Sequence, residues 1–404
     1  MLWAFIGQVL DADQCCRKAL NRIQAHLLSL GEAPVSTDTS GYCKARGRLP
    51  EGLLARLCRW LGSQTSGRAR PDDLWFRRRV LVVDGSSCSM PDTPENQTAY
   101  PQPCTQAPGC GFPVVGFVGV FCLTTGSLLG LTMGKHTVHD LSLFYFVRDV
   151  FEAGDVMLAD RAFSSYAEMA LMLRRKVDSV IRLHQARHPD FRRGRVVGIC
   201  DHLVKWPKPQ RTPRLSSADY ELLPDELTVR ELRYRIETQG FRTRSVTLAT
   251  TLLDTTVYTT EALAELYFRR WEVELDFAHI KTTMKMDILR CKTPDMVRKE
   301  IWAHLLAYNL VRAAMWDAVA QHHAPPGRIS FKGTIQILDA NRDFFSGRSP
   351  SSQAKLLDTL LALVAKQLVP LRPNRAEPRA RKRRPKEFPV MTKPRQQLKA
   401  ALRA

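Results

Sequence analysis

Three acidic side chains of this sequence could together bind a divalent metal. Asp84 and Asp160 each end a short apolar run that predicts a buried strand, which places both at the edge of a sheet where ligands bind in open α/β folds. Glu274 lies between apolar neighbours in a segment with helical periodicity. Carboxylates from three separate elements suit Mg²⁺ or Mn²⁺, which prefer hard oxygen ligands.

Such a site suggests phosphoryl transfer. Two ions about 4 Å apart can activate a water or a 3′-hydroxyl and stabilise the leaving oxygen of a phosphodiester. Taken singly, Asp84 and Asp160 are more often turn formers or helix caps. Together with Glu274 they favour a catalytic and metal-binding triad that holds two Mg²⁺ or Mn²⁺ ions.

A polar stripe accompanies Glu274 along its segment. On a helical wheel of roughly 100° per residue, four side chains fall within about 60° of one another: Tyr267, Arg270, Glu274 and Lys281. We expect Arg270 and Lys281 to bind DNA phosphates, the first through its planar fork and the second as a point charge. Tyr267 could stack or donate to a phosphate. The simpler alternative is an amphipathic helix with an internal Arg270–Glu274 pair.

The apolar face of the same wheel predicts which side of the helix is buried. It holds Leu266, Val273, Phe277, Ile280 and Met284, with Trp271 and Leu275 beyond the polar stripe. Glu272 and Asp276 are expected to point the opposite way, toward water.

Strands and helices are expected to alternate around the acids. Short apolar runs predict strands at 79–84, 154–160 and 177–183, the first two stopped by the aspartates. Helical periodicity predicts helices at 139–151, 163–176, 259–289 and 296–320, with Thr259 or Thr260 as the cap of the third.

Residues 112–134 carry no charge and are long enough to span a bilayer. The sequence TTGS at 124–127 interrupts them, and glycines and β-branched residues flank it. A two-stranded hairpin is therefore favoured over a membrane helix.

The remaining regions differ in composition, which suggests the domain boundaries. Residues 1–75 read as helices, and residues 184–256 alternate in polarity as an antiparallel β ribbon does. Ten basic and two acidic residues among the prolines of 372–395 predict a flexible arm. The expected units are 1–75, 76–183, 184–256, 257–323 and 324–404.

The charge balance favours a polyanionic partner. The 404 residues contain 60 Lys and Arg against 40 Asp and Glu, a net charge of +20, and nucleic acid is the commonest partner of such chains. A basic surface without function is the alternative. The ten cysteines show no C-x-x-C pair, and the N-terminus shows no secretion signal, so we expect reduced thiols and an intracellular protein.

Tyr267-x2-Arg270-x3-Glu274-x6-Lys281 resembles the Y-x2-R-x3-E-x6-K signature of bacterial insertion-sequence transposases of family four. The sequences DGS at 84–86 and DRAF at 160–163 resemble the other two acidic motifs of that family. The order of strands and helices and the basic, proline-rich end are also similar, so the resemblance covers nearly the whole chain.

This resemblance implies an α/β fold with a ribonuclease H-like mixed sheet flanked by helices. The intervals 160 − 84 = 76 and 274 − 160 = 114 fit such a core with an inserted antiparallel β subdomain before the last acid, between helical N- and C-terminal parts. It also implies a DDE transposase that acts on double-stranded DNA, on both inverted-repeat ends and target, as a synaptic homodimer. Such a protein is cytoplasmic, nucleoid-associated and free of the membrane.

The sequence departs from the family pattern at two places. Ala162 replaces a frequent glycine in the second motif, and many relatives carry more sequence before the N-terminus, where end recognition partly resides. A shortened product with an active core and weak end recognition is left open. Relatives also stack an aromatic residue on a flipped base near Trp206, but a core or surface role is the simpler interpretation of this tryptophan.

Two other functions fit part of the pattern. An inactive or repurposed DNA-binding relative would keep the basic surface but would not need three acids. A ribonuclease H-like nuclease would keep the acids and hydrolyse DNA without strand transfer. The intact triad favours a transposase over the first, and capture of a cut end into target DNA would separate it from the second.

Overall fold

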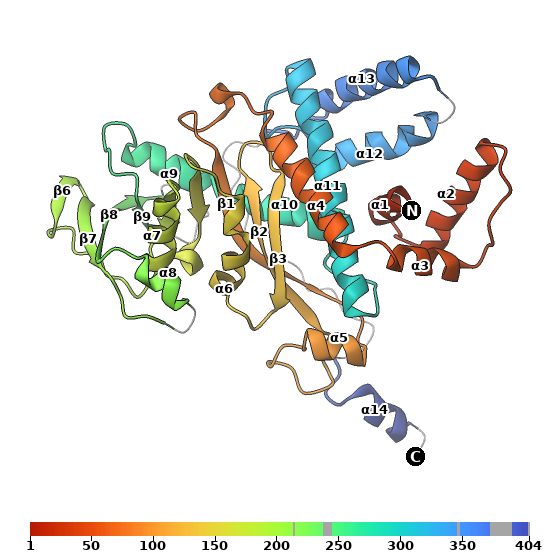
Figure 1. The fold of residues 1–404 in the computed structure, drawn as a ribbon, viewed down its shortest axis with the longest axis horizontal. Coiled ribbons are helices and arrows are strands. Elements are labelled where there is room, and N and C mark those ends of the chain that lie inside the picture. Colours follow the sequence, from red (N-terminus) through yellow and green to blue (C-terminus); the bar gives the residue numbers. More distant parts are fainter. Residues whose placement is uncertain (213–214, 237–244, 346–347, 372–389, 403–404) are drawn as a thin grey trace.

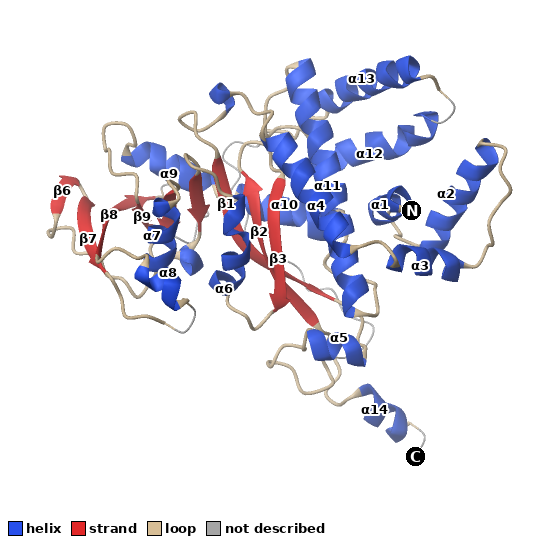
Figure 2. Cartoon of the chain, in the orientation of Figure 1, coloured by secondary structure: helices blue, strands red, loops and turns tan. Residues whose placement is uncertain are grey.

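One sheet runs through the centre of the molecule, with helices on both of its faces (Figures 1 and 2). The computed structural model describes residues 1–212, 215–236, 245–345, 348–371 and 390–402. Within these residues the sheet has nine strands in the order β3-β2-β1-β4-β5-β9-β8-β7-β6. The predicted mixed α/β sheet flanked by helices is confirmed.

The strands are β1 (Val80–Ser89), β2 (Val114–Cys122), β3 (Leu128–Lys135), β4 (Val156–Ala159), β5 (Asp178–Arg182), β6 (Arg195–Gly198), β7 (Asp201–Pro207), β8 (Glu226–Arg235) and β9 (Ser245–Thr250). Strands β1, β2 and β3 pair antiparallel in sequence, while β4 and β5 run parallel to β1. Strands β9, β8, β7 and β6 extend the same sheet by antiparallel pairing, starting from β5. The antiparallel ribbon expected in 184–256 is therefore present as a continuation of the central sheet.

The helices before the last part of the sheet are α1 (Leu2–Leu10), α2 (Cys16–Ser29), α3 (Thr39–Gly47), α4 (Glu51–Ser66), α5 (Pro94–Ala99), α6 (Asp140–Phe144), α7 (Tyr166–Arg174) and α8 (Ser217–Glu221). After it follow α9 (Thr260–Arg269), α10 (Glu272–Ala278), α11 (Pro294–His322), α12 (Phe331–Asn341), α13 (Pro350–Lys366) and α14 (Arg395–Ala401). The helices expected in 1–75 are present as α1 to α4. Most of the predicted basic arm, 372–389, lies outside the described residues.

The uncharged segment 112–134 forms the β2–β3 hairpin, as predicted. Its turn includes Gly126, whose φ of +66° is accessible to glycine without strain. Across the parts of the chain that the structure describes, no helix is long and apolar enough to cross a membrane.

Strand β1 is longer than the sequence suggested. It was expected to stop at Asp84 but continues to Ser89. Its pairing with β4 ends at Val83↔Ala159, whereas its pairing with β2 continues to Ser89↔Val114. The antiparallel partner therefore extends β1 beyond the point where the parallel partner leaves it.

The two faces of the sheet bury separate apolar clusters. Val80 and Val82 of β1 belong to the cluster that includes residues of α1, α4, α10 and α11. Leu81 and Val83 point to the other face, against α6 and α7. This alternation follows from the period of two in a strand, and it fixes the face on which each functional residue lies.

The helix predicted over 259–289 is interrupted. Thr259 caps α9, as expected, by accepting a hydrogen bond from the N–H of Ala262. The N–H groups of Arg270 and Trp271 then bond to carbonyls only three residues back, which is 3-10 geometry, before α10 begins. A π-helical turn, His279–Thr283, follows α10.

Candidate active site

Asp84 and Asp160 lie side by side because of strand pairing. The parallel register of β1 and β4 ends at Val83↔Ala159, so the next residue of each strand is an aspartate. Asp160 then caps a 3-10 turn, Arg161–Phe163, through its Oδ1, which accepts the N–H of Ala162 at 2.7 Å. The sequence predicted that two strands bring these acids to one edge of the sheet, and the strand pairing agrees with this prediction.

Asp84 faces the helix that carries Glu274. In the antiparallel pairing of β1 and β2, Asp84 lies opposite Gly119. A Cβ at Gly119 would lie 3.5 Å from the ring of Phe277 on α10. Residues directly opposite in such a pair project to the same side of the sheet, so Asp84 and α10 share that side.

Arg270 joins two of the three acids. Its Nη1 lies 3.4 Å from Oδ2 of Asp84, and its Nη2 lies 3.4 Å from Oε1 of Glu274. The guanidinium side chain is only 10% exposed, and its buried Nε has no hydrogen-bond partner in the described structure. Long contacts and an unpaired donor leave this buried cation incompletely satisfied, which is a state that an additional anion could relieve.

Burial dominates the electrostatics of Asp84. Loss of hydration raises the pKa of its carboxyl from 3.8 to about 6, while the charge of Arg270 acts to lower it. The negative charges of Asp160 and Glu274 add smaller contributions that raise the same pKa. Asp160 and Glu274 therefore both act electrostatically on Asp84, and a cation beside Asp84 would be stabilised.

Tyr267 and Lys281 complete the predicted stripe. Tyr267 is buried beside Arg270, and burial raises the pKa of its hydroxyl to about 12. Lys281, in the π-helical turn, donates from Nζ to Oγ of Ser86 at 3.2 Å, two residues beyond Asp84 on β1. The structure thus gathers all six sequence-predicted site residues around one stretch of β1.

The acids are close but are not arranged as a finished metal site. Among the described residues, no group of three or more His, Cys, Asp or Glu side chains is placed to hold a metal ion. Arg270 lies between Asp84 and Glu274, where a shared cation would have to bind. The donor set nonetheless fits Mg²⁺ or Mn²⁺ in chemistry, since it offers three carboxylates and Asp84 already has a cation as its partner.

Asp276 does not point toward water, as the wheel suggested. It is buried against α11, where it forms an ion pair and hydrogen bond with Arg312. Arg312 also donates from Nε to the hydroxyl of Tyr308 at 2.9 Å, and that hydroxyl donates to the carbonyl of Gly126 at 2.6 Å. This network fastens α10 to α11 and to the hairpin turn, and so fixes the backbone that carries Glu274.

Asp140 is a further acid near the site that sequence reasoning missed. Its carboxylate lies against Gly85, where an added Cβ would come within 2.6 Å of Oδ2. Burial raises the pKa of Asp140, and the charge of Asp160 adds to this effect. A carboxylate pressed against the DGS sequence explains why glycine follows Asp84.

A basic cavity adjoins Asp160. Its volume is about 230 Å³, and it is lined by Arg161, Arg182, Arg187 and Arg233, with His184 and His188. No carboxylate is found among the described residues that line it. Sequence patterns could not group these residues, because they come from separate segments that share no motif.

Trp206 occupies a core position, as the simpler interpretation predicted. Its side chain is buried, and Nε1 donates to Oε1 of Glu231 at 2.9 Å. The guanidinium of Arg187 lies 3.8 Å from the ring centroid.

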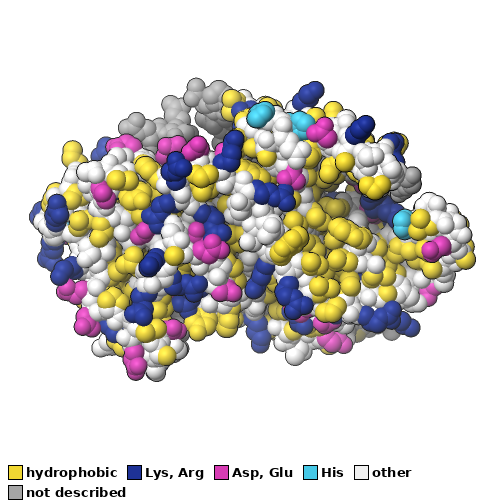
Figure 3. All heavy atoms as spheres, turned by 45° about the horizontal axis from the view of Figure 1, so that its top comes forward, with side chains coloured by type: hydrophobic (Ala, Val, Ile, Leu, Met, Phe, Trp, Pro, Cys, Tyr) yellow, Lys and Arg dark blue, Asp and Glu magenta, His cyan; other side chains and the backbone are white. Residues whose placement is uncertain are grey.

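Figure 3 shows that Lys and Arg side chains are spread over the visible face, with a broader apolar area in the half that contains the N-terminal helices.

The chain is similar to several transposases. A family model described as "Transposase DDE domain" matches residues 75–310. The chain is 28% identical to the transposase InsG for insertion sequence element IS4 of Escherichia coli, over 97% of this chain and 87% of that protein. It is 39% identical over 54 residues to the putative transposase InsL for insertion sequence element IS186A of Escherichia coli, over 13% of this chain and 15% of that protein.

The solved structure titled "Cryo-EM structure of piggyBac transposase synaptic complex with hairpin DNA (SNHP)" aligns with a TM-score of 0.39 and 10% identity, over 70% of this chain and 57% of that chain. The segment matched by the family model, 75–310, contains all six residues that lie around β1.

Proposed function

The chain belongs to the transposase DDE domain family and is a DNA transposase, and we propose that it cuts and joins DNA with Asp84, Asp160 and Glu274 as its catalytic acids. The observation that carries this proposal is geometric: the register of β1 and β4 places Asp84 beside Asp160, and Arg270 contacts both Asp84 and Glu274. Carboxylates brought together from distant parts of the sequence are costly to the fold unless a cation offsets their charge.

Asp84, Asp160 and Glu274 would hold Mg²⁺ or Mn²⁺, and we propose two ions. Divalent cations at such a site supply charge stabilisation for the attacking and leaving oxygens of a phosphodiester. For this to happen Arg270 must release Asp84 and Glu274, to which it is held by contacts of 3.4 Å.

A DNA phosphate is the natural new partner for Arg270. Its Nε has no hydrogen-bond partner in the described structure, and its contacts with the two acids are long. A phosphate oxygen could accept hydrogen bonds from these N–H groups. Lys281 lies on the same side and, within the described part of the chain, bonds only to a neutral hydroxyl, and we propose that it holds a second phosphate. Tyr267 supports Arg270 from the buried side.

The basic cavity beside Asp160 extends this phosphate path. Arg161, Arg182, Arg187 and Arg233 present positive charge without a carboxylate among the described lining residues. We propose that the DNA strand passes from the acids along this cavity toward the strands β7 and β8.

The sheet order supports a ribonuclease H-like core. An antiparallel β1–β2–β3 meander, with β4 and β5 added parallel to β1, gives the order β3-β2-β1-β4-β5. We propose that residues 76–183 and 257–323 form this core, that 184–256 are an insertion, and that 324–404 form a helical region with a basic arm.

Recognition of the DNA ends involves the N-terminal helices and a second copy of the chain. We propose that residues 1–75 contact the inverted-repeat ends and that two copies pair two ends in a synaptic homodimer, next to the nucleoid in the cytoplasm. The net charge of +20 supports contact with both donor and target duplexes.

The test is DNA cleavage by Glu274→Gln. The substrate is a labelled duplex that carries the inverted repeat found beside the gene, with Mg²⁺ titrated from zero. We expect the wild type to nick the duplex and join the cut end to a target plasmid, and the variant to bind the duplex without cutting it. Glu265→Gln is the matched control, because Glu265 is an exposed acid on the preceding helix α9.

The outcomes separate the alternatives. Equal cleavage by wild type and Glu274→Gln would remove Glu274 from the site. Cleavage by the wild type without plasmid capture would indicate a nuclease. Binding without any Mg²⁺-dependent cleavage would indicate a DNA-binding relative.

A further inference from the structure

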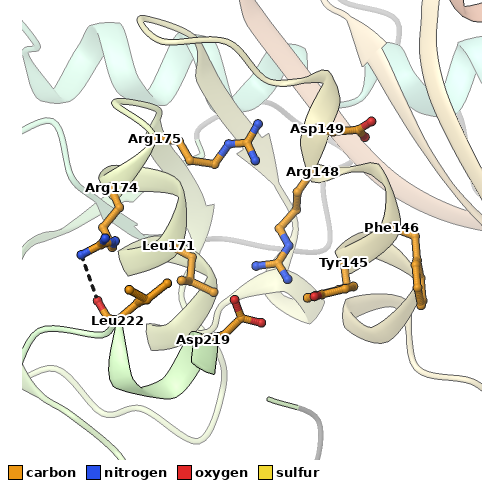
Figure 4. Close-up of a pocket in the computed structure, with 9 residues that line it drawn as sticks. All are labelled: Tyr145, Phe146, Arg148, Asp149, Leu171, Arg174, Arg175, Asp219 and Leu222. Carbon is orange, nitrogen blue, oxygen red and sulfur yellow. Dashed lines mark hydrogen bonds between the residues drawn. The ribbon is translucent and has the colours of Figure 1, made fainter. Parts of the chain in front are cut away.

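A second cavity lies on the face of the sheet opposite to the acids. Its volume is about 500 Å³, and it is bounded by the 3-10 helix Tyr145–Val150, by α7 and by α8 (Figure 4). The neighbouring residues Phe144, Val147 and Leu223 belong to the apolar cluster on the α6 and α7 face. Asp84 projects to the other face, toward α10. This cavity is therefore separate from the catalytic acids.

Three arginines supply its positive charge. Among the described residues Arg174 donates only to the carbonyl of Leu222, at 3.4 Å, and Arg175 only to the carbonyl of Phe151, at 3.2 Å. Within the described ranges neither has a carboxylate partner. Each guanidinium carries further N–H groups, so both can still bind an anion.

Arg148 occupies the centre of the cavity. It is paired with the buried Glu168 at 3.5 Å, and its guanidinium lies 4.2 Å from the ring centroid of Tyr145. Figure 4 shows Arg148 between Tyr145 and Asp219, while Asp149 points away from the centre. The three arginines are matched in number by Asp149, Glu168 and Asp219, but the acids do not pair with Arg174 and Arg175, so the uncompensated positive charge lies on the side of those two arginines.

Two aromatic rings form the rim beside these charges. Tyr145 is 46% exposed and Phe146 is 65% exposed, and their rings meet edge to face at 5.3 Å between centroids. Exposed aromatic side chains next to arginines are a platform on which unpaired bases stack while phosphates meet the charges. The bases of a duplex are already stacked and paired, so they would gain nothing from these rings.

We propose that this cavity binds single-stranded DNA, with a phosphate at Arg174 and Arg175 and a base against Tyr145 or Phe146. The site goes beyond the cutting and joining of duplex DNA proposed above, since it lies on the other face of the sheet. Its physiological occupant rests on that function, because a cleaved and processed duplex exposes unpaired strands.

The test is the affinity for a labelled oligothymidylate, measured by fluorescence anisotropy in metal-free buffer at several salt concentrations. The Arg174→Ala/Arg175→Ala double variant should bind about tenfold more weakly, and its dependence of log K on log salt should fall by about 1.4, as expected for two lost phosphate contacts. Phe146→Ala, which removes an exposed ring and leaves the core intact, should weaken binding at least about fivefold.

Controls separate this site from the rest of the basic surface. Lys355→Ala/Lys366→Ala removes two exposed charges from α13 and should change neither affinity nor salt slope beyond the general charge effect. An oligonucleotide that carries 5-iododeoxyuridine should crosslink to Tyr145 or Phe146, as mapped by mass spectrometry.

Three results would overturn the proposal. The first is an unchanged salt slope in the arginine variant. The second is an equal loss of affinity for duplex and single-stranded DNA together with no effect of Phe146→Ala, and the third is displacement of the oligonucleotide by polyglutamate at equal charge concentration. Because binding is measured without metal, loss of cleavage does not enter the result. Binding at this site by a protein that cannot cut DNA would support the present proposal and refute only the catalytic one.

Discussion

Replacement of Arg270 by glutamine should tighten metal binding by the free protein. Arg270 is the cation that Asp84 and Glu274 share, at 3.4 Å from each, so a divalent ion must compete with it. Removal of the charge removes the competitor. A residue that serves only as a phosphate clamp would give no such effect in the absence of DNA.

The size of the effect follows from the two contacts. The Asp84 side chain is 21% exposed, so its long charged contact is worth about 1.5 kcal/mol, the lower end for hydrogen bonds to charged groups. The Glu274 side chain is 47% exposed, and an exposed pair of this kind contributes about 0.5 kcal/mol. Together they amount to roughly 2 kcal/mol, which corresponds to an affinity change of about 30-fold.

The assay is a Mn²⁺ titration followed by electron paramagnetic resonance, at pH 8 and without DNA. Arg270 lowers the pKa of Asp84, so the variant has a higher pKa there than the value of about 6 in the wild type, and a pH well above 6 keeps the acid ionised. Arg269→Gln is the matched control, since Arg269 pairs with Glu272 at 2.8 Å and does not contact the site.

Unchanged or weaker Mn²⁺ binding by Arg270→Gln would refute the reasoning. Agreement would also imply that DNA and metal bind with positive coupling. A phosphate that draws Arg270 away releases the carboxylates, and by linkage the metal then favours the DNA-bound state by the same factor.

Three other changes have expected outcomes. Asp84→Asn should stabilise the metal-free protein by about 1–3 kcal/mol at pH 7 and not at pH 3.5, as urea unfolding at both pH values would test. The reason is that the pKa of Asp84 is raised from 3.8 to about 6 in the folded state, which therefore binds the proton more tightly than the unfolded state. Wild-type stability then falls as the pH rises from about 4 to 6. Gly62→Ala should lower the unfolding free energy by at least about 2 kcal/mol, because its Cβ would lie 2.0 Å from the carbonyl oxygen of Leu128, and an unshifted urea midpoint would contradict this packing. Lys281→Ala should weaken duplex binding and lower its salt slope by about one, and a constant slope would argue against a phosphate contact.

The closeness of Asp84 and Asp160 could be predicted from sequence because it depends on local pattern. Two apolar runs that each end in aspartate become neighbours as soon as the runs pair in parallel, and the register puts them one residue beyond Val83↔Ala159. The sequence did not reveal that β1 continues to Ser89, because that extension depends on pairing with β2, a separate segment.

Asp276 was misplaced for a reason visible on the wheel itself. Four residues at roughly 100° each separate it from Ile280 by about 40°, so it lies at the edge of the buried face. Whether such an acid is buried depends on a partner, and Arg312 lies 36 residues away on α11. Gly62 also depends on a distant partner, since it lies inside α4 against the carbonyl oxygen of Leu128.

The basic cavity and Asp140 were beyond the reach of sequence patterns. Arg182, Arg187 and Arg233 come from β5, from the loop after it and from β8, and only the pairing of β5 with β9 and of β9 with β8 brings them together. Asp140 becomes part of the site surroundings only because α6 packs against β1 at Gly85. Positions of this kind depend on tertiary packing, which local periodicity does not encode.

The polar stripe survived the interruption of its helix, and the geometry explains why. The 3-10 turn at Arg270 winds the chain more tightly than an α-helix, with three residues per turn, whereas the π-helical turn that holds Lys281 winds it less tightly. The two irregular turns lie on either side of α10, so their opposite rotations partly cancel. Arg270, Glu274 and Lys281 therefore still face β1, while the irregular turns give Arg270 and Lys281 backbone positions that a continuous helix would not offer.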